Sequence, residues 1–363
     1  MTQTANFHGS DLEKIEQIYG IPKEQIVSFS ANVNPLGISP KLKRALSKKI
    51  DVISTYPDRD YTNLRTCIGE YVGIDKDYII VGNGSTELIS IFIQIRCPKK
   101  ALILGPTYSE YEREVSLGGG VSLYYPLKES DDFRLNVSHF IEQLNDSIDL
   151  IVICNPNNPT SSSVSQKDMR AILDACKQYD IYVMVDETYV EFADNWQDIT
   201  AIPLTRYYNN IIILRGVSKF FAAPGLRLGY AICGNEDLIR AINQRKNPWT
   251  INSLAEAAGE LMFTDFDYIQ QTKKLISSER KLIFEHLSKN PHYKVYPPTG
   301  NFILLQILDN DITSQDLFEK AIRKGFMIRD CSTFPFLDNK FIRFCIMNPE
   351  DNDKLISFLE NIN

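Results

Sequence analysis

Residues 149–192 read DLIVICNPNNPTSSSVSQKDMRAILDACKQYDIYVMVDETYVEF, and this stretch decides the class of fold. Its two apolar runs, at 149–154 and 181–186, are rich in β-branched residues and are bounded by Asp or Asn, as buried strands are. Between them, residues 165–180 combine a Ser–Asp capping pattern with apolar residues at helical spacing. A strand–helix–strand order implies a mostly parallel sheet with helices covering both faces.

Apolar runs on either side extend this pattern. ALIL (101–104) and IIILRG (211–216) are two more predicted strands. The last third of the chain differs, because a long helical stretch at about 254–287 is followed by strands at 302–307 and 340–346. We therefore predict an α/β protein, with a three-layer αβα domain built on a mostly parallel sheet and a smaller α/β C-terminal domain. The predicted boundaries are an N-terminal arm at 1–40 near the small domain and the active site, a large domain at 41–250 and a small domain at 251–363.

Composition excludes several classes of protein. A net charge of −7 disfavours a nucleic-acid-binding protein, which would normally carry a basic excess. The seven cysteines are odd in number and form no C-x-x-C pair, so reduced thiols in a cytoplasmic protein are expected. Only four histidines are present, and we expect no metal site. The chain starts without an apolar signal segment and has no apolar run long enough to span a bilayer, so no membrane contact is expected.

The segment GVSKFFAAPGLRLGY (216–230) carries the strongest chemical signal. Lys219 directly follows a strand, where burial would lower its pKa and free its lone pair to form a Schiff base. Arg227 has the planar fork that pairs with a phosphate, and Ser218 offers a hydroxyl to the same group. The alternative is a solvated lysine and arginine at the end of a strand.

Asp186 ends an apolar strand, and ligands in open α/β sheets bind at that end. A buried carboxylate there needs a cationic partner. A protonated pyridine nitrogen would be such a partner, and the pairing would let the ring accept electrons. Tyr189 would hydrogen-bond a phenolic oxygen on the same ring. The alternative is an aspartate that caps a helix or forms a salt bridge.

Three further loops contain candidate site residues. Ser85 and Thr86 end the glycine-rich turn GNGST, where a helix start offers N–H groups to a phosphate. Asn158 lies in CNPNNPTSS, a rigid turn that would aim its amide at the ring. Tyr108, in GPTYSEY, would stack on the ring. Alone, each of these is also explained by an ordinary turn or a packed tyrosine.

The chain resembles the class I and II aminotransferase superfamily, the fold-type-I pyridoxal-phosphate enzymes. The resemblance is carried by six motifs in the expected order, namely GNGSTE, GPTYSEY, NPNNPT, DETYVEF, SKFFAAPGLRLGY and FIRFCI. The resemblance runs from about residue 7 to the C-terminus. It implies a homodimeric enzyme that binds pyridoxal 5′-phosphate and acts at the α-carbon of an amino acid. It also implies catalytic roles for Lys219, which would bond to the cofactor and shuttle protons, for Asp186 at the ring nitrogen and for Tyr108 on the ring face.

The same resemblance implies the remaining site residues. Asn158 and Tyr189 would contact the phenolic oxygen, and Asn158 would also line the substrate pocket. The cofactor phosphate would be bound by Ser85, Thr86, Ser218 and Arg227, and by Tyr56 reaching over from the neighbouring subunit. Arg343 would receive the substrate's α-carboxylate.

Two relatives within the superfamily fit the chain, and both accept phosphorylated substrates. They are the threonine-phosphate decarboxylases of cobalamin biosynthesis and the histidinol-phosphate aminotransferases. HGS (8–10), IVSFSANVNPLG (26–37) and MIRDCSTF (327–334) resemble the decarboxylases more closely, as does Pro224. This favours decarboxylation of O-phospho-L-threonine or O-phospho-L-serine to an amino-alcohol phosphate. Tyr189 is more typical of the aminotransferases, which keeps transamination as the alternative.

By the resemblance to the decarboxylases, His8, Gly9, Asn32 and Arg329 would line the substrate pocket. Arg329 would grip the substrate phosphate, because arginine offers a permanent bidentate charge. The alternatives are a disordered terminal histidine and a surface ion pair.

Two other classes of function stay open. A non-catalytic regulator or degenerate scaffold is one, although Lys219, Asp186, Arg227 and Arg343 are all intact. A nucleotide-binding α/β protein is the other, suggested only by GNGSTE. Ser161 departs from the family, in which glycine usually follows NPNNPT, and a serine is strained there if the turn requires a positive φ.

Overall fold

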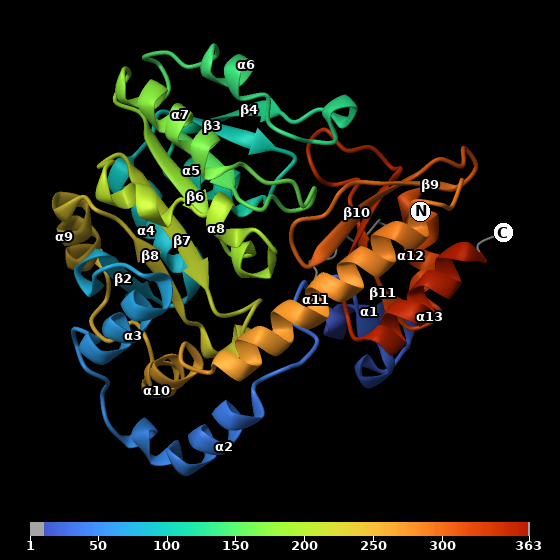
Figure 1. Ribbon diagram of the computed structural model, residues 1–363, viewed down its shortest axis with the longest axis horizontal. Helices are drawn as coiled ribbons and strands as arrows, with labels where there is room; N and C mark the ends of the chain where they lie inside the picture. The colour runs from blue at the N-terminus through green and yellow to red at the C-terminus, as the bar shows by residue number, and fades with distance from the viewer. Residues whose placement is uncertain (1–10, 362–363) are drawn as a thin grey trace.

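The computed structural model describes residues 11–361, which form two sheets joined by a long helix (Figure 1). The larger sheet has seven strands in the order β2 (Ile79–Gly82), β8 (Gly229–Ile232), β7 (Ile211–Gly216), β6 (Tyr182–Asp186), β5 (Leu150–Cys154), β3 (Lys100–Gly105) and β4 (Val121–Pro126). All pairs from β7 to β4 are parallel, whereas β8 runs antiparallel to both of its neighbours. The predicted mostly parallel sheet is therefore confirmed, with β2, β4 and β8 added to it.

Side chains alternate between the two faces of this sheet, as the period of a strand requires. On β5, Ile151 belongs to the apolar cluster that includes α7 (Gln166–Lys177), and Val152 belongs to the cluster that includes α4 (Gly84–Arg96). The second cluster also takes in α5 (Glu110–Leu117) and α9 (Glu236–Arg245). Helices thus cover both faces, and the three-layer αβα architecture is confirmed. The shorter helices α6 (Val137–Ile141) and α8 (Trp196–Ile199) lie in the connections of this unit.

The smaller sheet has four antiparallel strands in the order β12 (Arg329–Asp330), β13 (Phe341–Cys345), β10 (Phe302–Ile307) and β9 (Tyr293–Val295). It is accompanied by α12 (Ser314–Ile322) and α13 (Pro349–Glu360). This is the smaller α/β unit expected near the C-terminus. The domain boundaries drawn from the sequence stay a prediction.

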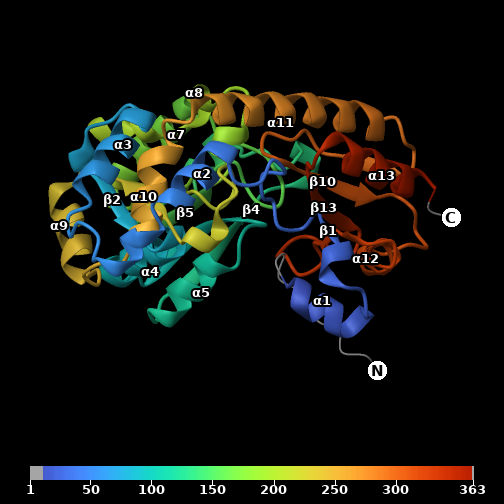
Figure 2. The ribbon, with the colours of Figure 1, turned by 90° about the horizontal axis from the view of Figure 1, so that it is seen from below.

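The helical stretch predicted at 254–287 is two helices rather than one. They are α10 (Ser253–Met262) and α11 (Phe266–Leu287), and they are separated at Asp265, whose backbone leaves helical geometry. Asp265 is buried, and its carboxylate accepts a hydrogen bond from the Ser39 hydroxyl. This tertiary contact holds the break between the two helices against the segment before α2. Beyond the break, α11 runs from the larger sheet to the smaller one (Figure 2).

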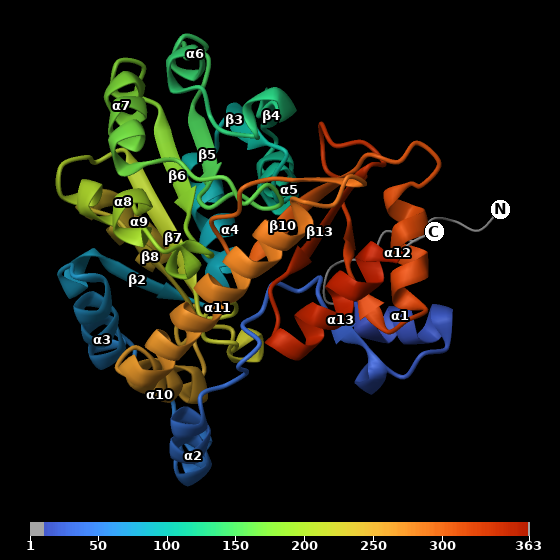
Figure 3. The same cartoon turned by 45° about the vertical axis from the view of Figure 1, so that its right-hand side comes forward.

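The N-terminal segment packs against the smaller unit. Here α1 (Leu12–Tyr19) lies beside α12 (Figure 3), and Tyr19 meets Phe318 edge to face. A short strand, β1 (Val27–Ser28), pairs in parallel with β11 (Phe326–Met327). The chain then crosses to the other unit through α2 (Pro40–Lys48) and α3 (Thr62–Val72). The segment between β1 and α2 is thereby held between the two sheets.

All seven cysteines are free thiols. Among residues 11–361, no helix combines the length and the apolar character that crossing a bilayer requires.

Candidate functional site

A cavity of about 370 Å³ lies between the two sheets. One wall comes from the ends of β5 and β6 and the segment after β7, and the other comes from the smaller sheet and the segment 30–33. The predicted site residues that line the cavity are Asn32, Ser85, Thr86, Tyr108, Asn158, Asp186, Tyr189, Ser218, Lys219, Arg227, Arg329 and Arg343. His8 and Gly9 lie outside the described residues. Tyr56 is not part of the cavity wall; its side chain is 80% exposed on the surface.

Lys219 presents its amine to the cavity from the segment after β7. Its Nζ donates a hydrogen bond to the carbonyl oxygen of Ala31 at 2.6 Å. Burial, with a smaller contribution from the charge on Arg343, lowers the pKa of this amine to about 8. A lysine with such a pKa has a much larger fraction of free amine at neutral pH than an ordinary one, as a nucleophile requires.

Asp186 is the last residue of β6 and is buried against the cavity. Its Oδ1 accepts from the backbone N–H of Thr188 at 2.9 Å and from the Thr188 hydroxyl at 2.5 Å, while its Oδ2 accepts from the Tyr111 hydroxyl at 2.7 Å. Burial raises the pKa of Asp186, and these hydrogen bonds oppose that rise. The carboxylate is therefore held in one orientation by donors on both oxygens.

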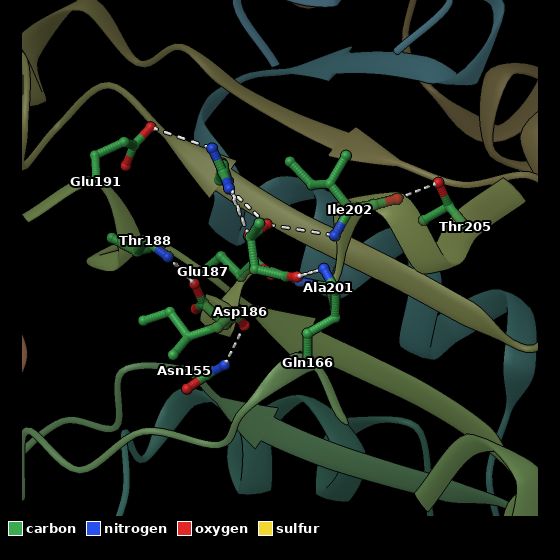
Figure 4. A network of polar contacts seen from close by, with 12 residues as sticks. Asn155, Gln166, Asp186, Glu187, Thr188, Glu191, Ala201, Ile202 and Thr205 are labelled. Carbon is green, nitrogen blue, oxygen red and sulfur yellow. Dashed lines mark hydrogen bonds and ion pairs between the residues drawn. The ribbon is translucent and has the colours of Figure 1, made fainter. Parts of the chain in front are cut away.

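A buried ion pair fixes the chain next to Asp186 (Figure 4). Arg215 on β7 donates from Nη2 to Oε2 of Glu187 at 2.7 Å, and both side chains are fully buried. Glu187 also accepts from the Ala201 N–H at 2.6 Å and from the Thr200 hydroxyl at 2.8 Å. Removing one member of such a network leaves an uncompensated buried charge. The hydrogen bonds and the ion pair of Glu187 thus anchor the end of β6 to the neighbouring segments. The side chain of Asp186, the residue before it, lines the cavity.

An anion-binding cradle forms where α4 begins. Gly84 has φ +77°, a conformation that favours glycine, and a Cβ added to it would lie 2.5 Å from Nη2 of Arg227, so glycine leaves room for the guanidinium there. Ser85 and Thr86 follow in the first turn of this thirteen-residue helix. Helix N-termini present free N–H groups and a positive dipole end to an anion. Together with Ser218 and Arg227, this end of the cavity has the chemistry of a phosphate site.

Two arginines face the cavity from the smaller sheet. Arg329 and Arg343 are directly opposite each other on β12 and β13. Arg343 is buried and donates to Oδ1 of Asn158 and, at 2.6 Å, to the carbonyl of Ser30. Arg329 donates to the Thr333 hydroxyl at 3.2 Å, and burial lowers its pKa from the usual value. Two adjacent guanidinium groups suit a ligand that carries two anionic groups.

Three buried polar atoms of the cavity-lining residues have no hydrogen-bond partner within the described part of the chain. They are Oδ1 of Asn32, Oγ1 of Thr107 and Nε of Arg343. Leaving a buried polar atom unpaired costs about 1–3 kcal/mol. In a cavity, such atoms are available to bind a polar ligand.

The cavity also contains residues that the sequence interpretation missed. Tyr111, Thr188, Thr107 and Cys154 all line it. Two of them carried a local signal. Tyr111 stands three residues after Tyr108, and Thr188 stands two residues after Asp186, the spacing at which an aspartate side chain accepts a hydrogen bond from a backbone N–H. Cys154 carried none, since only the pairing of β5 with β6 places it opposite Asp186.

The turn at Ser161 does require a positive φ, the conformation in which a serine is strained. Its φ is +60°, and the residue is fully buried. Its hydroxyl accepts hydrogen bonds from the N–H groups of Thr299 at 3.1 Å and Gly300 at 2.8 Å. A glycine would adopt this φ freely but would lack both hydrogen bonds. The serine therefore ties the loop that carries Asn158 to the turn before β10.

Comparison with known proteins places the chain among well-described relatives. The family model described as aminotransferase class I and II matches residues 24–359. The threonine-phosphate decarboxylase of Salmonella typhimurium is 32% identical over 355 residues, which cover 98% of this chain and 96% of that protein. The adenosylcobalamin biosynthesis bifunctional protein CobDQ of Leptospira interrogans is 32% identical over 359 residues, covering 98% of this chain and 41% of that protein. The solved histidinol-phosphate aminotransferase from Clostridium acetobutylicum has a TM-score of 0.85 and 30% identity, covering 92% of this chain and 98% of that one.

Proposed function

Because the chain belongs to the class I and II aminotransferase family, a family of pyridoxal-phosphate enzymes, we propose that it decarboxylates O-phospho-L-threonine, or its serine analogue, in cobalamin biosynthesis. The product would be an amino-alcohol phosphate. The observation that carries this proposal is the pair Arg329 and Arg343 on adjacent strands of the cavity wall. A phosphorylated amino acid has a phosphate and an α-carboxylate, and each arginine can bind one of them bidentately.

The residues of the cavity fit the cofactor. Lys219 supplies an amine with a lowered pKa for its aldehyde, and Asp186 supplies a buried carboxylate for its ring nitrogen. The cradle of Ser85, Thr86 and Arg227 around Gly84 supplies the phosphate site, where an added Cβ would collide with the guanidinium. Tyr108 is available to stack on the ring, while Asn158 and Tyr189 are available to bind its phenolic oxygen. When bound, pyridoxal phosphate accepts the electron pair of a bond at the substrate's α-carbon.

The protein decides which bond at the α-carbon breaks by holding the substrate. In decarboxylation the carboxylate leaves as carbon dioxide, and Nζ of Lys219 then delivers a proton to the α-carbon. In transamination the same Nζ removes the α-proton instead. Arg343 and Arg329 would orient the carboxylate and the phosphate, and Asn32 lines the cavity beside them. The choice of reaction is therefore a matter of substrate orientation.

Transamination of the histidinol-phosphate type is the second candidate. Two observations favour it: Tyr189 lines the cavity, and the solved aminotransferase is 30% identical over almost its whole length. The two reactions need the same lysine and the same carboxylate. They differ in their products, so a product measurement separates them.

A substrate screen tests the proposal. Purified enzyme with pyridoxal phosphate is incubated with O-phospho-L-threonine, O-phospho-L-serine, or histidinol phosphate plus 2-oxoglutarate, and products are identified by mass spectrometry. We expect carbon dioxide and an amino-alcohol phosphate from a phosphoamino acid. Formation of glutamate from histidinol phosphate without carbon dioxide would instead establish the aminotransferase.

Arg329 provides a second test. Arg329→Gln removes a charge-assisted bidentate contact worth about 1.5–3 kcal/mol, so KM for the phosphoamino acid should rise about 10- to 100-fold. Arg329→Lys, the matched control, keeps the charge but loses the fork, and its KM should fall between those of wild type and Arg329→Gln. Unchanged KM values would remove Arg329 from the phosphate site.

We also propose that the protein is a cytoplasmic homodimer in which Tyr56 reaches the cofactor phosphate of the neighbouring subunit. The support is an aromatic pair on the surface: Tyr56 is 80% exposed and Trp249 is 42% exposed, with ring centroids 4.8 Å apart. Ile53, which is 63% exposed, lies close in the sequence. Large apolar side chains that gather on a surface are typical of interfaces.

A further inference from the structure

We propose that Tyr111 is a positioning residue that keeps the proton of the Asp186–cofactor pair on the ring nitrogen. Tyr111 would do so by donating a hydrogen bond to the carboxylate, without contacting the substrate. The inference rests on the proposed cofactor, but it does not depend on which substrate the enzyme uses.

The position of Tyr111 is fixed by packing on all sides. It lies in the first turn of α5 and is fully buried. Its hydroxyl donates to Oδ2 of Asp186 at 2.7 Å, and its ring meets that of Tyr108 edge to face at 5.6 Å between centroids. Tyr111 therefore contacts both the residue predicted at the ring nitrogen and the residue predicted on the ring face.

Counting acceptor sites shows why this hydrogen bond matters. A carboxylate offers about four lone-pair sites, two on each oxygen. Thr188 occupies two of them with its N–H and its hydroxyl, both on Oδ1. Tyr111 occupies one on Oδ2. The site left for a ring N–H is on Oδ2, so the cofactor and Tyr111 would share one oxygen.

The hydroxyl of Tyr111 stays a donor throughout the working pH range. Burial, followed by the charge on Asp186, raises the pKa of Tyr111 well above its usual value, so the hydroxyl keeps its proton. Donation to Oδ2 favours the ionised carboxylate, whereas burial of Asp186 favours the neutral acid. Without Tyr111, Asp186 would be more basic and would draw the proton from the ring nitrogen. A ring without that proton is a weaker electron acceptor.

The test measures the protonation of the ring nitrogen directly. Wild type and Tyr111→Phe are stripped of cofactor and reconstituted with pyridoxal phosphate labelled with ¹⁵N in the ring. We expect the ¹⁵N resonance of Tyr111→Phe to move toward the unprotonated position relative to wild type. We also expect kcat to fall about tenfold at nearly constant KM, because the lost interaction is one charge-assisted hydrogen bond.

Tyr230→Phe is the matched control. Tyr230 is equally buried, it does not line the cavity as Tyr111 does, and its hydroxyl lies near Arg215 rather than Asp186. Removing this hydroxyl should leave the ¹⁵N resonance where it is in wild type. A general loosening of the core would instead move the resonance in both variants.

A second variant keeps the inference testable if Tyr111→Phe does not fold. Site-specific 3-fluorotyrosine at position 111 makes the phenol a stronger donor with little change of shape, and the ¹⁵N resonance should move toward the protonated position. An unchanged resonance in a folded variant with bound cofactor would overturn the role of Tyr111 alone. Failure of wild type to bind pyridoxal phosphate would overturn the cofactor assignment and this inference with it.

Discussion

Lys219 illustrates how single residues acquire their chemistry from their surroundings. Its position after a strand is visible in the sequence, but its lowered pKa comes from burial and from Arg343, more than a hundred residues away. The same holds for Asp186, whose ionisation depends on the hydroxyls of Tyr111 and Thr188. At this scale the residue type limits which reactions are possible, and the neighbouring groups set the pKa that determines whether the residue is reactive at neutral pH.

The lowered pKa of Lys219 makes a prediction about cofactor uptake. Only the unprotonated amine attacks an aldehyde, so the rate at which apo-protein bonds to pyridoxal phosphate should level off above pH 8 and fall about tenfold per pH unit below it. Stopped-flow absorbance from pH 6 to pH 10 measures this rate. Lys219→Arg, the control, should give no borohydride-stable adduct. A midpoint near 10.5, the ordinary value, would contradict the prediction.

At the scale of elements, the loop after β5 and the turn before β10 behave as one unit. Ser161 links them through the N–H groups of Thr299 and Gly300, which both donate to its hydroxyl, and the Thr299 N–H also donates to its carbonyl oxygen. The same loop carries Asn158, which binds Arg343 on β13. The strain of a positive φ at Ser161 is thus offset by contacts between the two sheets.

Two substitutions at Ser161 separate strain from hydrogen bonding. Ser161→Ala loses two hydrogen bonds and keeps the strain, so the free energy of unfolding should fall by about 1–3 kcal/mol. Ser161→Gly loses the same bonds but relieves about 1 kcal/mol of strain, so its loss should be smaller. Urea denaturation of both variants measures the difference.

Ser163→Ala serves as a control for these substitutions, because within the described part of the chain the Ser163 hydroxyl makes a single contact, at 3.4 Å, with the Thr299 hydroxyl. Its free energy of unfolding should stay within about 0.5 kcal/mol of wild type. Equal losses for Ser161→Ala and Ser161→Gly would show that the conformation at residue 161 stores no strain.

At the scale of the whole molecule, the site exists only because two sheets and the N-terminal segment meet. Lys219 and Asp186 come from the larger sheet, Arg329 and Arg343 come from the smaller one, and Asn32 comes from the segment between β1 and α2. The long helix α11 and the crossing segment hold the two units together (Figure 2). A relative shift of the units would change the position of the arginines with respect to Lys219.

The proposed homodimer predicts complementation between two inactive variants. If Tyr56 completes the neighbour's site, Tyr56→Ala and Lys219→Ala should each lose most activity. A mixed dimer would contain one site with both Lys219 and Tyr56 intact. Unfolding and refolding the two variants together should therefore restore up to about one quarter of wild-type activity, because random pairing makes half of the dimers mixed.

Refolding each variant alone is the control for this experiment, and analytical ultracentrifugation checks that the mixed species is a dimer. Absence of recovery in a confirmed mixed dimer would place Tyr56 outside the site. A monomeric wild type would remove the proposed dimer altogether.

Much of the fold and the site was predictable, because it rests on local patterns. The strands around 101–104, 149–154, 181–186 and 211–216 are mostly apolar and mostly buried, as is typical of parallel strands in the middle of a sheet. By contrast, β4 lies at the edge of the sheet and alternates between exposed and half-buried positions over its first four residues, and β8 is short and begins with a glycine. Asp265, at the break between α10 and α11, contacts Ser39, which is distant in the sequence. Contacts of this kind leave no periodic signal.

By itself, the sequence determined the fold class, the family and the residue types that meet a phosphate, an aldehyde and a ring nitrogen, since each rests on side-chain chemistry and local spacing. Only the tertiary structure decided that Arg329 stands opposite Arg343, that Tyr111 holds Asp186 and that Ser161 joins the two sheets. These pairings depend on which distant segments pack together. Packing is decided by the shape and burial of the whole chain, which no short motif contains.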